Sequence, residues 1–192
     1  MPWLILALGY LLGCIPTAYI IGHIVKGVDI REIGDGNMGA ANSYRQLGPR
    51  AGITVGVIDA AKGALAVFIA QVVGLSLLFV LLTGIAVVVG HNWPVFLGFR
   101  GGRGEATAIG VLLVVIPQPM LIMAAPTIAA QLIFRDTTKS AAVLFIPLSL
   151  VCWLTGQSGA FIAYSIGLPC LVGFTHFLRT RHVAETSGTG RT

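Results

Sequence analysis

The sequence predicts an all-α integral membrane protein, a bundle of about seven transmembrane helices forming one domain over residues 1–178. Hydrophobic residues make up 56% of the 192 residues and charged residues only 10%, whereas soluble domains carry roughly 25% charged residues. Apolar runs recur along the chain at about the length, roughly 20 residues, that a helix needs to cross a bilayer. The cations fall in alternate loops, which is typical of a multi-pass topology.

The predicted spans are apolar runs bounded by glycine, proline or charge. They are Trp3–Val25, Ala51–Gly74, Ser76–Leu97, Thr107–Ile116, Met120–Phe134, Ser140–Thr155 and Ala160–Phe177. The fourth of these is short enough to be a half-span packed inside the bundle instead. Small residues spaced four apart, as at Gly9 and Gly13 and before Gly90, predict close packing between helices. Residues 179–192 form a polar C-terminal tail.

Positive charge outside the spans lies on one side of the predicted bundle. These cations are Lys26, Arg31, Arg45, Arg50, Arg100, Arg103, Arg135, Lys139, Arg179, Arg181 and Arg191. The intervening turns carry no charge, so the positive-inside rule places the N-terminus outside and the C-terminus in the cytoplasm. Loops 26–50, 90–105 and 135–139 would then face the cytoplasm. A net charge of +5 scattered over short loops indicates topology and anionic ligands rather than nucleic acid.

The first polar loop combines glycines with neutral hydrogen-bonding side chains. Its Gly34, Gly36 and Gly39 satisfy G-x-G-x-x-G, but a dinucleotide site needs this motif after a β-strand, and here it follows a membrane span. What remains is a glycine-rich backbone with donors that can orient hydroxyl or phosphate oxygens. The candidates are Gly36, Asn37, Gly39, Asn42 and Arg45. The alternative is a tight loop in which asparagine caps the next helix.

The stretch from Gly90 to Gly104 sets two arginines among glycines at the end of a span. Glycine permits close backbone approach to an anion, and arginine matches phosphate oxygens with a planar fork. Arg100, Gly101, Gly102, Arg103 and Gly104 are therefore candidate phosphate ligands. The alternative is a basic, flexible loop on the cytoplasmic side. His91, just before this stretch, is either a catalytic group or a hydrogen-bonding cap.

Two further polar positions complete the candidate site. Asp59 and Lys62 lie i,i+3 inside a span, where an unpaired charge is costly, so they are either functional or a structural ion pair. Thr138, in the break between Arg135 and Lys139, can supply a hydroxyl or cap the next helix. Three loops, several cations and many glycines on one face predict a site where a phosphorylated polar substrate meets a lipid.

These motifs together resemble the bacterial acyl-phosphate:glycerol-3-phosphate acyltransferase family, often called PlsY. The similar motifs are Gly34-x-Gly36-Asn37-x-Gly39-Ala40-x-Asn42 with Arg45, Asp59-x-x-Lys62-Gly63, and Gly90-His91-x-x-Pro94-x-Phe96-x-x-Phe99-Arg100-Gly101-Gly102-Arg103-Gly104. Their order, spacing and topology agree over about residues 3–178. The H-x-x-x-x-D box of other glycerol-phosphate acyltransferases is absent, since Phe96 stands five residues after His91.

The resemblance implies transfer of an acyl group from acyl phosphate to the 1-hydroxyl of glycerol 3-phosphate. The products would be lysophosphatidic acid and phosphate, in phospholipid synthesis at the bacterial plasma membrane, without acyl-CoA, cofactor or metal. The implied catalytic residues are His91, Asn37 and Arg103. The implied substrate- and phosphate-binding residues are Gly36, Gly39, Asn42, Arg45, Lys62, Arg100, Gly101, Gly102, Gly104 and Thr138. The departing phosphate would take the hydroxyl proton, with His91 as the protein alternative.

The chain departs from the family pattern near the expected phosphate site. Asp35 and Ala41 stand where the family has hydroxyl residues. Arg100 and Arg103 replace lysines, and Glu105 replaces a small apolar residue. Because Asp35 would repel a phosphate unless Arg31 or Arg45 compensates it, a second hypothesis stays open: a non-enzymatic membrane protein, either a degenerate paralogue or a small anion or lipid transporter.

Overall fold

The structure, a computed structural model, describes residues 1–188, with side chains described through residue 180. The described residues form ten α-helices and two 3-10 helices, without strands. In chain order they are α1 (Pro2–Gly13), α2 (Thr17–Lys26), η1 (Ile30–Glu32), α3 (Ala40–Leu47), α4 (Pro49–Val72), α5 (Leu77–Asn92), η2 (Val95–Leu97), α6 (Glu105–Val115), α7 (Pro117–Phe134), α8 (Thr137–Phe145), α9 (Leu148–Leu154) and α10 (Gly159–Gly188).

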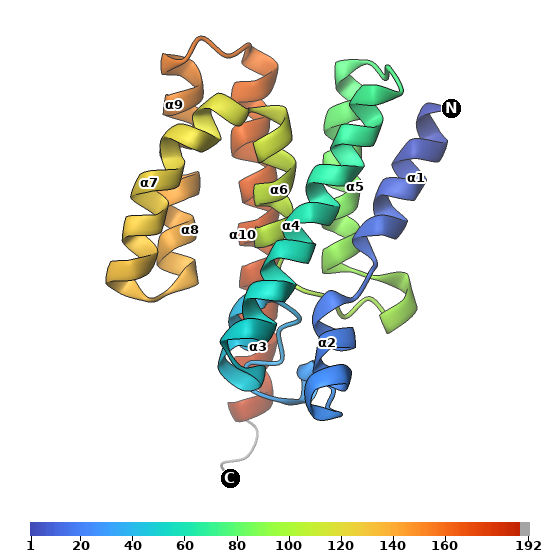
Figure 1. The fold of residues 1–192 in the computed structure, drawn as a ribbon, viewed down its shortest axis with the longest axis vertical. Coiled ribbons are helices and arrows are strands. Elements are labelled where there is room, and N and C mark those ends of the chain that lie inside the picture. Colours follow the sequence, from blue (N-terminus) through green and yellow to red (C-terminus); the bar gives the residue numbers. More distant parts are fainter. Residues whose placement is uncertain (189–192) are drawn as a thin grey trace.

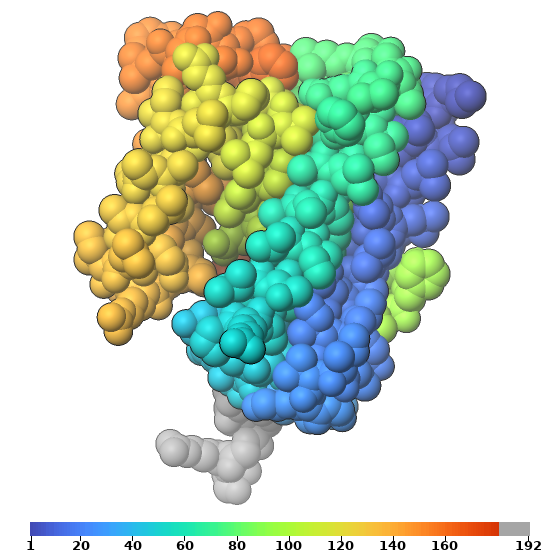
Figure 2. All heavy atoms as spheres, in the orientation of Figure 1, coloured from blue at the N-terminus to red at the C-terminus, as the bar shows by residue number. Residues whose placement is uncertain are grey.

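The helices pack around a centre made by α4, α5 and α6. Helix α4 lies against α6, and α1 lies against α5. Helices α7 to α9 form an arm that returns to the bundle through α10, as Figure 1 shows. A notch separates the lower end of this arm from the α3–α4 end of the bundle (Figure 2). The chain begins at one end of the molecule, and α10 runs toward the opposite end (Figure 1).

The expected membrane architecture agrees with the helices in type and closely in number. Within the described residues, six helical stretches are long and apolar enough to cross a membrane. They are Pro2–Lys26, Pro49–Val72, Leu77–Leu97, Pro117–Phe134, Thr137–Leu154 and Gly159–Thr180. The remaining predicted span corresponds to α6, which has only 11 residues. It is too short to cross the hydrocarbon alone, and its buried residues place it inside the bundle.

The sequence suggested one continuous helix for the first predicted span, but the structure has two helices there. It breaks between α1 and α2 at Cys14, Ile15 and Pro16. Proline has no backbone N–H to continue the ladder, and its ring clashes with the preceding turn, so the helix restarts after Pro16. Helix α2 then ends at Gly27, whose φ of +68° suits glycine. The break brings polar backbone into the bundle, beside the candidate site.

Close helix packing at the small residues is confirmed. A Cβ added at Gly13 would meet the backbone of Val87, and one added at Gly90 would meet the backbone of Tyr10. Glycine therefore lets α1 and α5 approach until their backbones touch. This packing fixes the end of α5, where His91 lies.

The end of α10 differs from the sequence-based expectation, and the cap of α8 is a residue that the expectation did not name. Helix α10 continues to Gly188 rather than ending at Phe177, so the first part of the predicted tail is helical. The rest of that tail, residues 189–192, lies outside the described residues. Helix α8 is capped by Asp136, whose carboxylate accepts hydrogen bonds from the N–H groups of Thr138 and Lys139 at 2.8 and 3.2 Å. Thr138 is therefore not the cap of α8.

Candidate active site

The largest polar cavity lies where the first polar loop (26–50) and the second polar loop (90–105) meet α10. We call it the arginine chamber. It has a volume of about 640 Å³. It is lined by Arg31, Asp35, Gly36, Asn37, Trp93, Phe99, Arg100, Arg103, Thr175, Leu178 and Arg179. With four arginines against one carboxylate in its lining, the chamber suits a multiply charged anion.

Asp35 is compensated within the protein. Its carboxylate lies 2.9 Å from Nη2 of Arg45 and 3.6 Å from Nη2 of Arg103. The same carboxylate accepts a hydrogen bond from the N–H of Asn37, which shapes the loop. Of the two expected compensating cations, Arg45 is the one that pairs with Asp35. Arg45 contacts the chamber through this pair and is not itself part of the lining.

Arg31 is held in the chamber by a different acid. Its Nε and Nη2 both donate to the carboxylate of Asp29, at distances between 2.6 and 3.0 Å. Its Nη1 donates to the carbonyl of Leu97 at 3.4 Å, and its guanidinium lies over the ring of Tyr19. The hydrogen bonds from Arg31 to the Asp29 carboxylate lower the pKa of Asp29. The arginine is thus fixed in place and connects the first polar loop to the second.

The two candidate asparagines of the first loop have different roles. The amide of Asn42 donates to the carbonyls of Ile30, Ile33 and Asn37 at 3.1 to 3.2 Å, and its oxygen accepts from the N–H of Asp35. Asn42 is therefore committed to holding the loop closed. Asn37, in contrast, has a buried side-chain oxygen without a hydrogen-bond partner among the described residues. It lines the chamber, and its amide is free to bind a ligand.

The glycines of the second polar loop let that loop fold back over His91. The N–H groups of Gly101 and Gly102 donate to the carbonyls of Asn92 and His91 at 3.2 and 3.1 Å. A Cβ at Gly102 would collide with the His91 ring, which explains the need for glycine there. Because these two N–H groups are used within the loop, they do not form the expected anion-binding backbone. Side chains of the chamber, including Arg100 and Arg103, are left to hold the charge.

His91 belongs to a buried polar cluster inside the bundle. Its Nδ1 lies 3.6 Å from Oδ1 of Asp59, which also accepts a hydrogen bond from Thr17 at 2.9 Å. Lys62 completes the cluster with an ion pair to Asp59 at 2.8 Å. Both charged residues are almost fully buried. Asp59 thus orients His91, and the buried charges compensate one another.

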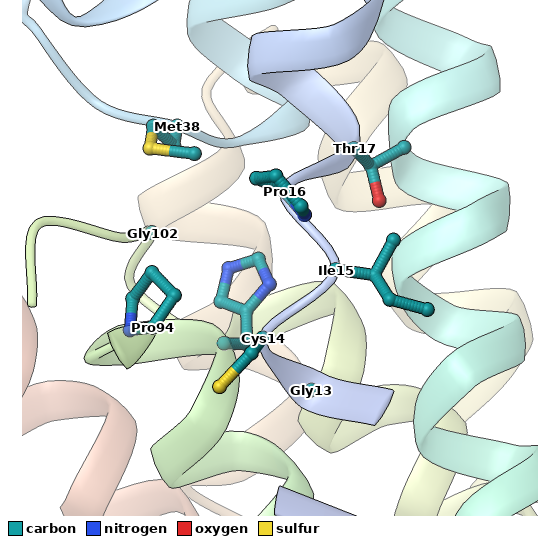
Figure 3. Close-up of a pocket in the computed structure, with 9 residues that line it drawn as sticks. Gly13, Cys14, Ile15, Pro16, Thr17, Met38, Pro94 and Gly102 are labelled. Carbon is teal, nitrogen blue, oxygen red and sulfur yellow. The ribbon is translucent and has the colours of Figure 1, made fainter. Parts of the chain in front are cut away.

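Lys62 is directed toward the helix break rather than the arginine chamber. Its ammonium donates to the carbonyl of Ile15 at 3.0 Å, in the break after α1, and this carbonyl also accepts the N–H of Thr17 at 3.1 Å. In Figure 3, Ile15 and Thr17 extend toward α4, while Pro94 and Gly102 lie on the opposite side of the break. The break and the second polar loop therefore pack on one another. Direct contact between Lys62 and a substrate stays a prediction.

Helix α10 contributes residues that sequence reasoning missed. Arg179 lines the chamber and donates to the backbone carbonyl of Asn92 at 2.8 Å. Thr175, one turn earlier, accepts a hydrogen bond from the Asn92 amide at 2.9 Å. The spacing of Thr175 and Arg179, i and i+4 at the charged end of the last span, was the available signal. The structure joins this end of α10 to the end of α5.

Two further cavities follow the chamber, each sharing lining residues with the one before it. The first, which we call the neck, has a volume of about 100 Å³ and shares Asn37 and Arg103 with the chamber. Gly39, Gly104, Thr138, Asp59 and His91 also line the neck. The second, which we call the apolar groove, has a volume of about 570 Å³ and lies among α8, α9 and α10. The neck and the groove share Glu105, Thr138 and His176.

The two outer cavities have opposite kinds of surface. The chamber is cationic, and the groove is lined mainly by apolar side chains such as Phe145 and Ile166. His91 lines the neck between them. Such an arrangement can hold a phosphate, a reacting carbonyl and an apolar chain in one line. Among the residues that the structure describes, no group of three or more histidine, cysteine or acidic side chains is placed to hold a metal ion.

Comparison with known proteins gives consistent matches over nearly the whole chain. A family model described as glycerol-3-phosphate acyltransferase matches residues 3–186. The protein called glycerol-3-phosphate acyltransferase 4 in Dehalococcoides mccartyi is 52% identical over 181 residues, which are 94% of this chain and 98% of the relative. A glycerol-3-phosphate acyltransferase of Synechococcus sp. is 40% identical over 173 residues, covering 90% and 85% of the two chains.

Solved structures match the fold as well. The crystal structure of PlsY (YgiH), an integral membrane glycerol 3-phosphate acyltransferase, in its glycerol 3-phosphate form has a TM-score of 0.84 and 31% sequence identity, covering 96% of this chain and 92% of that one. The lysophosphatidic acid form of the same protein has a TM-score of 0.82 with the same identity and coverage.

Proposed function

Since this chain belongs to the glycerol-3-phosphate acyltransferase family, we propose a division of its catalytic reaction among the three cavities. The chain is an acyltransferase enzyme of phospholipid synthesis and an integral membrane protein. In our proposal, the arginine chamber binds the phosphate of glycerol 3-phosphate, the neck holds the reacting groups, and the apolar groove holds the acyl chain. The observation that carries this assignment is that the neck shares lining residues with a cationic cavity on one side and an apolar one on the other.

The donor in this proposal is acyl phosphate. Acyl phosphate is a mixed anhydride of a carboxylic acid and phosphoric acid, so its carbonyl is already activated. The enzyme therefore needs to position the acceptor and stabilise developing charge rather than form a covalent intermediate. Arg103 lines both the chamber and the neck, and it can therefore contact the phosphate on either substrate. Thr138, which lines both the neck and the groove, can orient the donor by a hydrogen bond.

The chemical step follows from these positions. The 1-hydroxyl oxygen of glycerol 3-phosphate attacks the acyl carbonyl carbon, and the bond from that carbon to the phosphate oxygen breaks. The phosphate leaves with the bonding electrons and takes the hydroxyl proton, giving lysophosphatidic acid and inorganic phosphate. Asn37 orients the attacking hydroxyl with its unpartnered amide oxygen. His91, held by Asp59, is the protein group that can take the proton instead.

The test is a donor comparison with purified protein and labelled glycerol 3-phosphate. With acyl phosphate we expect lysophosphatidic acid and inorganic phosphate in equal amounts, and with acyl-CoA we expect neither. Product from acyl-CoA alone would overturn the assignment of the donor. If neither donor gives product, the result would favour the non-enzymatic alternative for this particular chain, in which Asp35 has disabled the chamber.

We further propose that the site faces the cytoplasm of a bacterial cell, with the chain in the plasma membrane and its N-terminus outside. The support is the one-sided distribution of cations. The polar loops that carry them lie toward the end of the molecule to which α10 runs (Figure 1). Glycerol 3-phosphate is a charged metabolite, so a cytoplasmic chamber would meet it directly.

A further inference from the structure

Glu105 occupies the boundary between the neck and the apolar groove. It is the first residue of α6 and lines both cavities, as Thr138 and His176 also do. No hydrogen bond or ion pair reaches its carboxyl from any residue that the structure describes. A partly buried carboxyl without a protein partner, at the junction of a polar and an apolar cavity, is available to a ligand.

Glu105 is surrounded by charges of both signs. The groups that face it are Arg103 on the preceding loop, Asp136 before α8, His176 on α10, and Asp59 and His91 across the neck from α4 and α5. Lys62 neutralises Asp59. Burial raises the pKa of Glu105 to about 7, against the opposing effect of Arg103 and with a contribution from Asp136. The carboxyl is outside the six long apolar helices.

The two forms of this carboxyl would treat an acyl phosphate oppositely. The neutral form has an O–H that can donate to the carbonyl or phosphate oxygens of the donor, which offer acceptors only. The ionised form offers only acceptors and a negative charge beside a negatively charged phosphate. Glycerol 3-phosphate in the chamber is less affected, because Glu105 is not part of the chamber lining.

We propose that Glu105 is a specificity-determining residue for the acyl donor, binding acyl phosphate through its neutral carboxyl and rejecting it when ionised. This inference rests on the proposed function, in which acyl phosphate crosses the neck. It deepens that function by giving the donor a pH-dependent affinity that the acceptor does not share. Above the pKa of the free enzyme, donor binding must include protonation of Glu105, so affinity falls as pH rises.

The experiment measures the KM for acyl phosphate and for glycerol 3-phosphate between pH 6.5 and 8.5. The variants are Glu105→Gln, whose amide donates a hydrogen bond but does not titrate, and Glu105→Ala, which does neither. Glu32→Gln is the matched control, because Glu32 is exposed in η1 and lines none of the three cavities. The substrates titrate in the same way in both assays, so comparing the natural protein with Glu105→Gln cancels the pH dependence that comes from the substrates.

We expect the donor KM of the natural protein to rise about 25-fold over this pH range, and that of Glu105→Gln to stay nearly level. Glu105→Ala should raise the donor KM about tenfold at the lower pH. In every variant the KM for glycerol 3-phosphate should change by less than about twofold.

Equal pH dependence of the donor KM in the natural protein and Glu105→Gln would overturn the inference, as would an unchanged donor KM in a folded Glu105→Ala variant. If Glu105→Ala does not fold, the glutamine comparison alone decides. Failure of the proposed function is a separate result: the natural protein would then transfer no acyl group from acyl phosphate at any pH.

Discussion

Replacing Asp35 with serine removes a carboxylate from a cavity that is otherwise lined by four arginines. The Asp35 oxygen lies within 3.6 Å of both Arg45 and Arg103 and so occupies donors that a phosphate could use. A serine hydroxyl can still accept the hydrogen bond from the N–H of Asn37, which keeps the turn of the loop. The substitution therefore changes mainly the charge of the chamber.

The expected magnitude follows from Coulomb's law. At a separation of about 6 Å and an effective dielectric of about 20, each pair of unit charges repels by about 3 kcal/mol, which is an upper bound. The Asp35 side chain is 33% exposed and already paired, so solvent screening lowers the net penalty to about 1 kcal/mol. The KM for glycerol 3-phosphate should then fall about fivefold in Asp35→Ser. The value of kcat should change less, because repulsion acts on bound substrate and transition state alike.

The assay is initial-rate kinetics with varied glycerol 3-phosphate at low salt, repeated at high salt, where the difference should shrink. Asp35→Asn serves as the control that keeps the shape of the side chain without its charge. If Asp35 mainly repels substrate, both variants should show the lower KM. An unchanged or higher KM in both would refute this reasoning and mean that Asp35 holds Arg45 and Arg103 in place for the substrate.

Two further predictions concern the second polar loop and the topology. Gly102→Ala should lower kcat/KM at least about tenfold, because the added Cβ would displace His91. Gly167→Ala is the control and should not lower it, because an added Cβ there meets nothing. Near-normal turnover in a folded Gly102→Ala protein would exclude His91 from catalysis. Cysteines placed at Arg45, Arg103 and Thr138, in a background without the three native cysteines, should react with an impermeant reagent only after cells are opened. Reaction in intact cells would reverse the proposed sidedness.

The membrane spans could be predicted because span length and hydropathy are properties of consecutive residues. The break at Pro16 was visible in principle, since proline interrupts a helix, but an apolar run conceals it from a hydropathy argument. The length of α6 was correctly in doubt. Its burial against α4 depends on glycines whose packing partners lie far away in the sequence.

The candidate site was predictable in residue type but not in geometry. Sequence alone could not separate Asn37, with its unpartnered oxygen, from Asn42, which is consumed by three backbone carbonyls. It also could not place Arg179, because that arginine enters the chamber only through the packing of α10 on α5. Lys62 illustrates the same limit. The carbonyl of Ile15 can accept its hydrogen bond only because the first span breaks there.

The most direct test of the account is the kinetic effect of replacing Arg103, which lines both the chamber and the neck. Removal of a charged phosphate partner costs about 2 to 5 kcal/mol, so Arg103→Ala should lower kcat/KM by tens- to thousands-fold. Arg103→Lys should keep part of the activity, since lysine retains the charge but not the planar fork. Arg50→Ala is the matched control, because Arg50 is exposed and outside the three cavities. A folded Arg103→Ala protein with near-normal turnover would contradict the account and leave the arginine as a topology signal only.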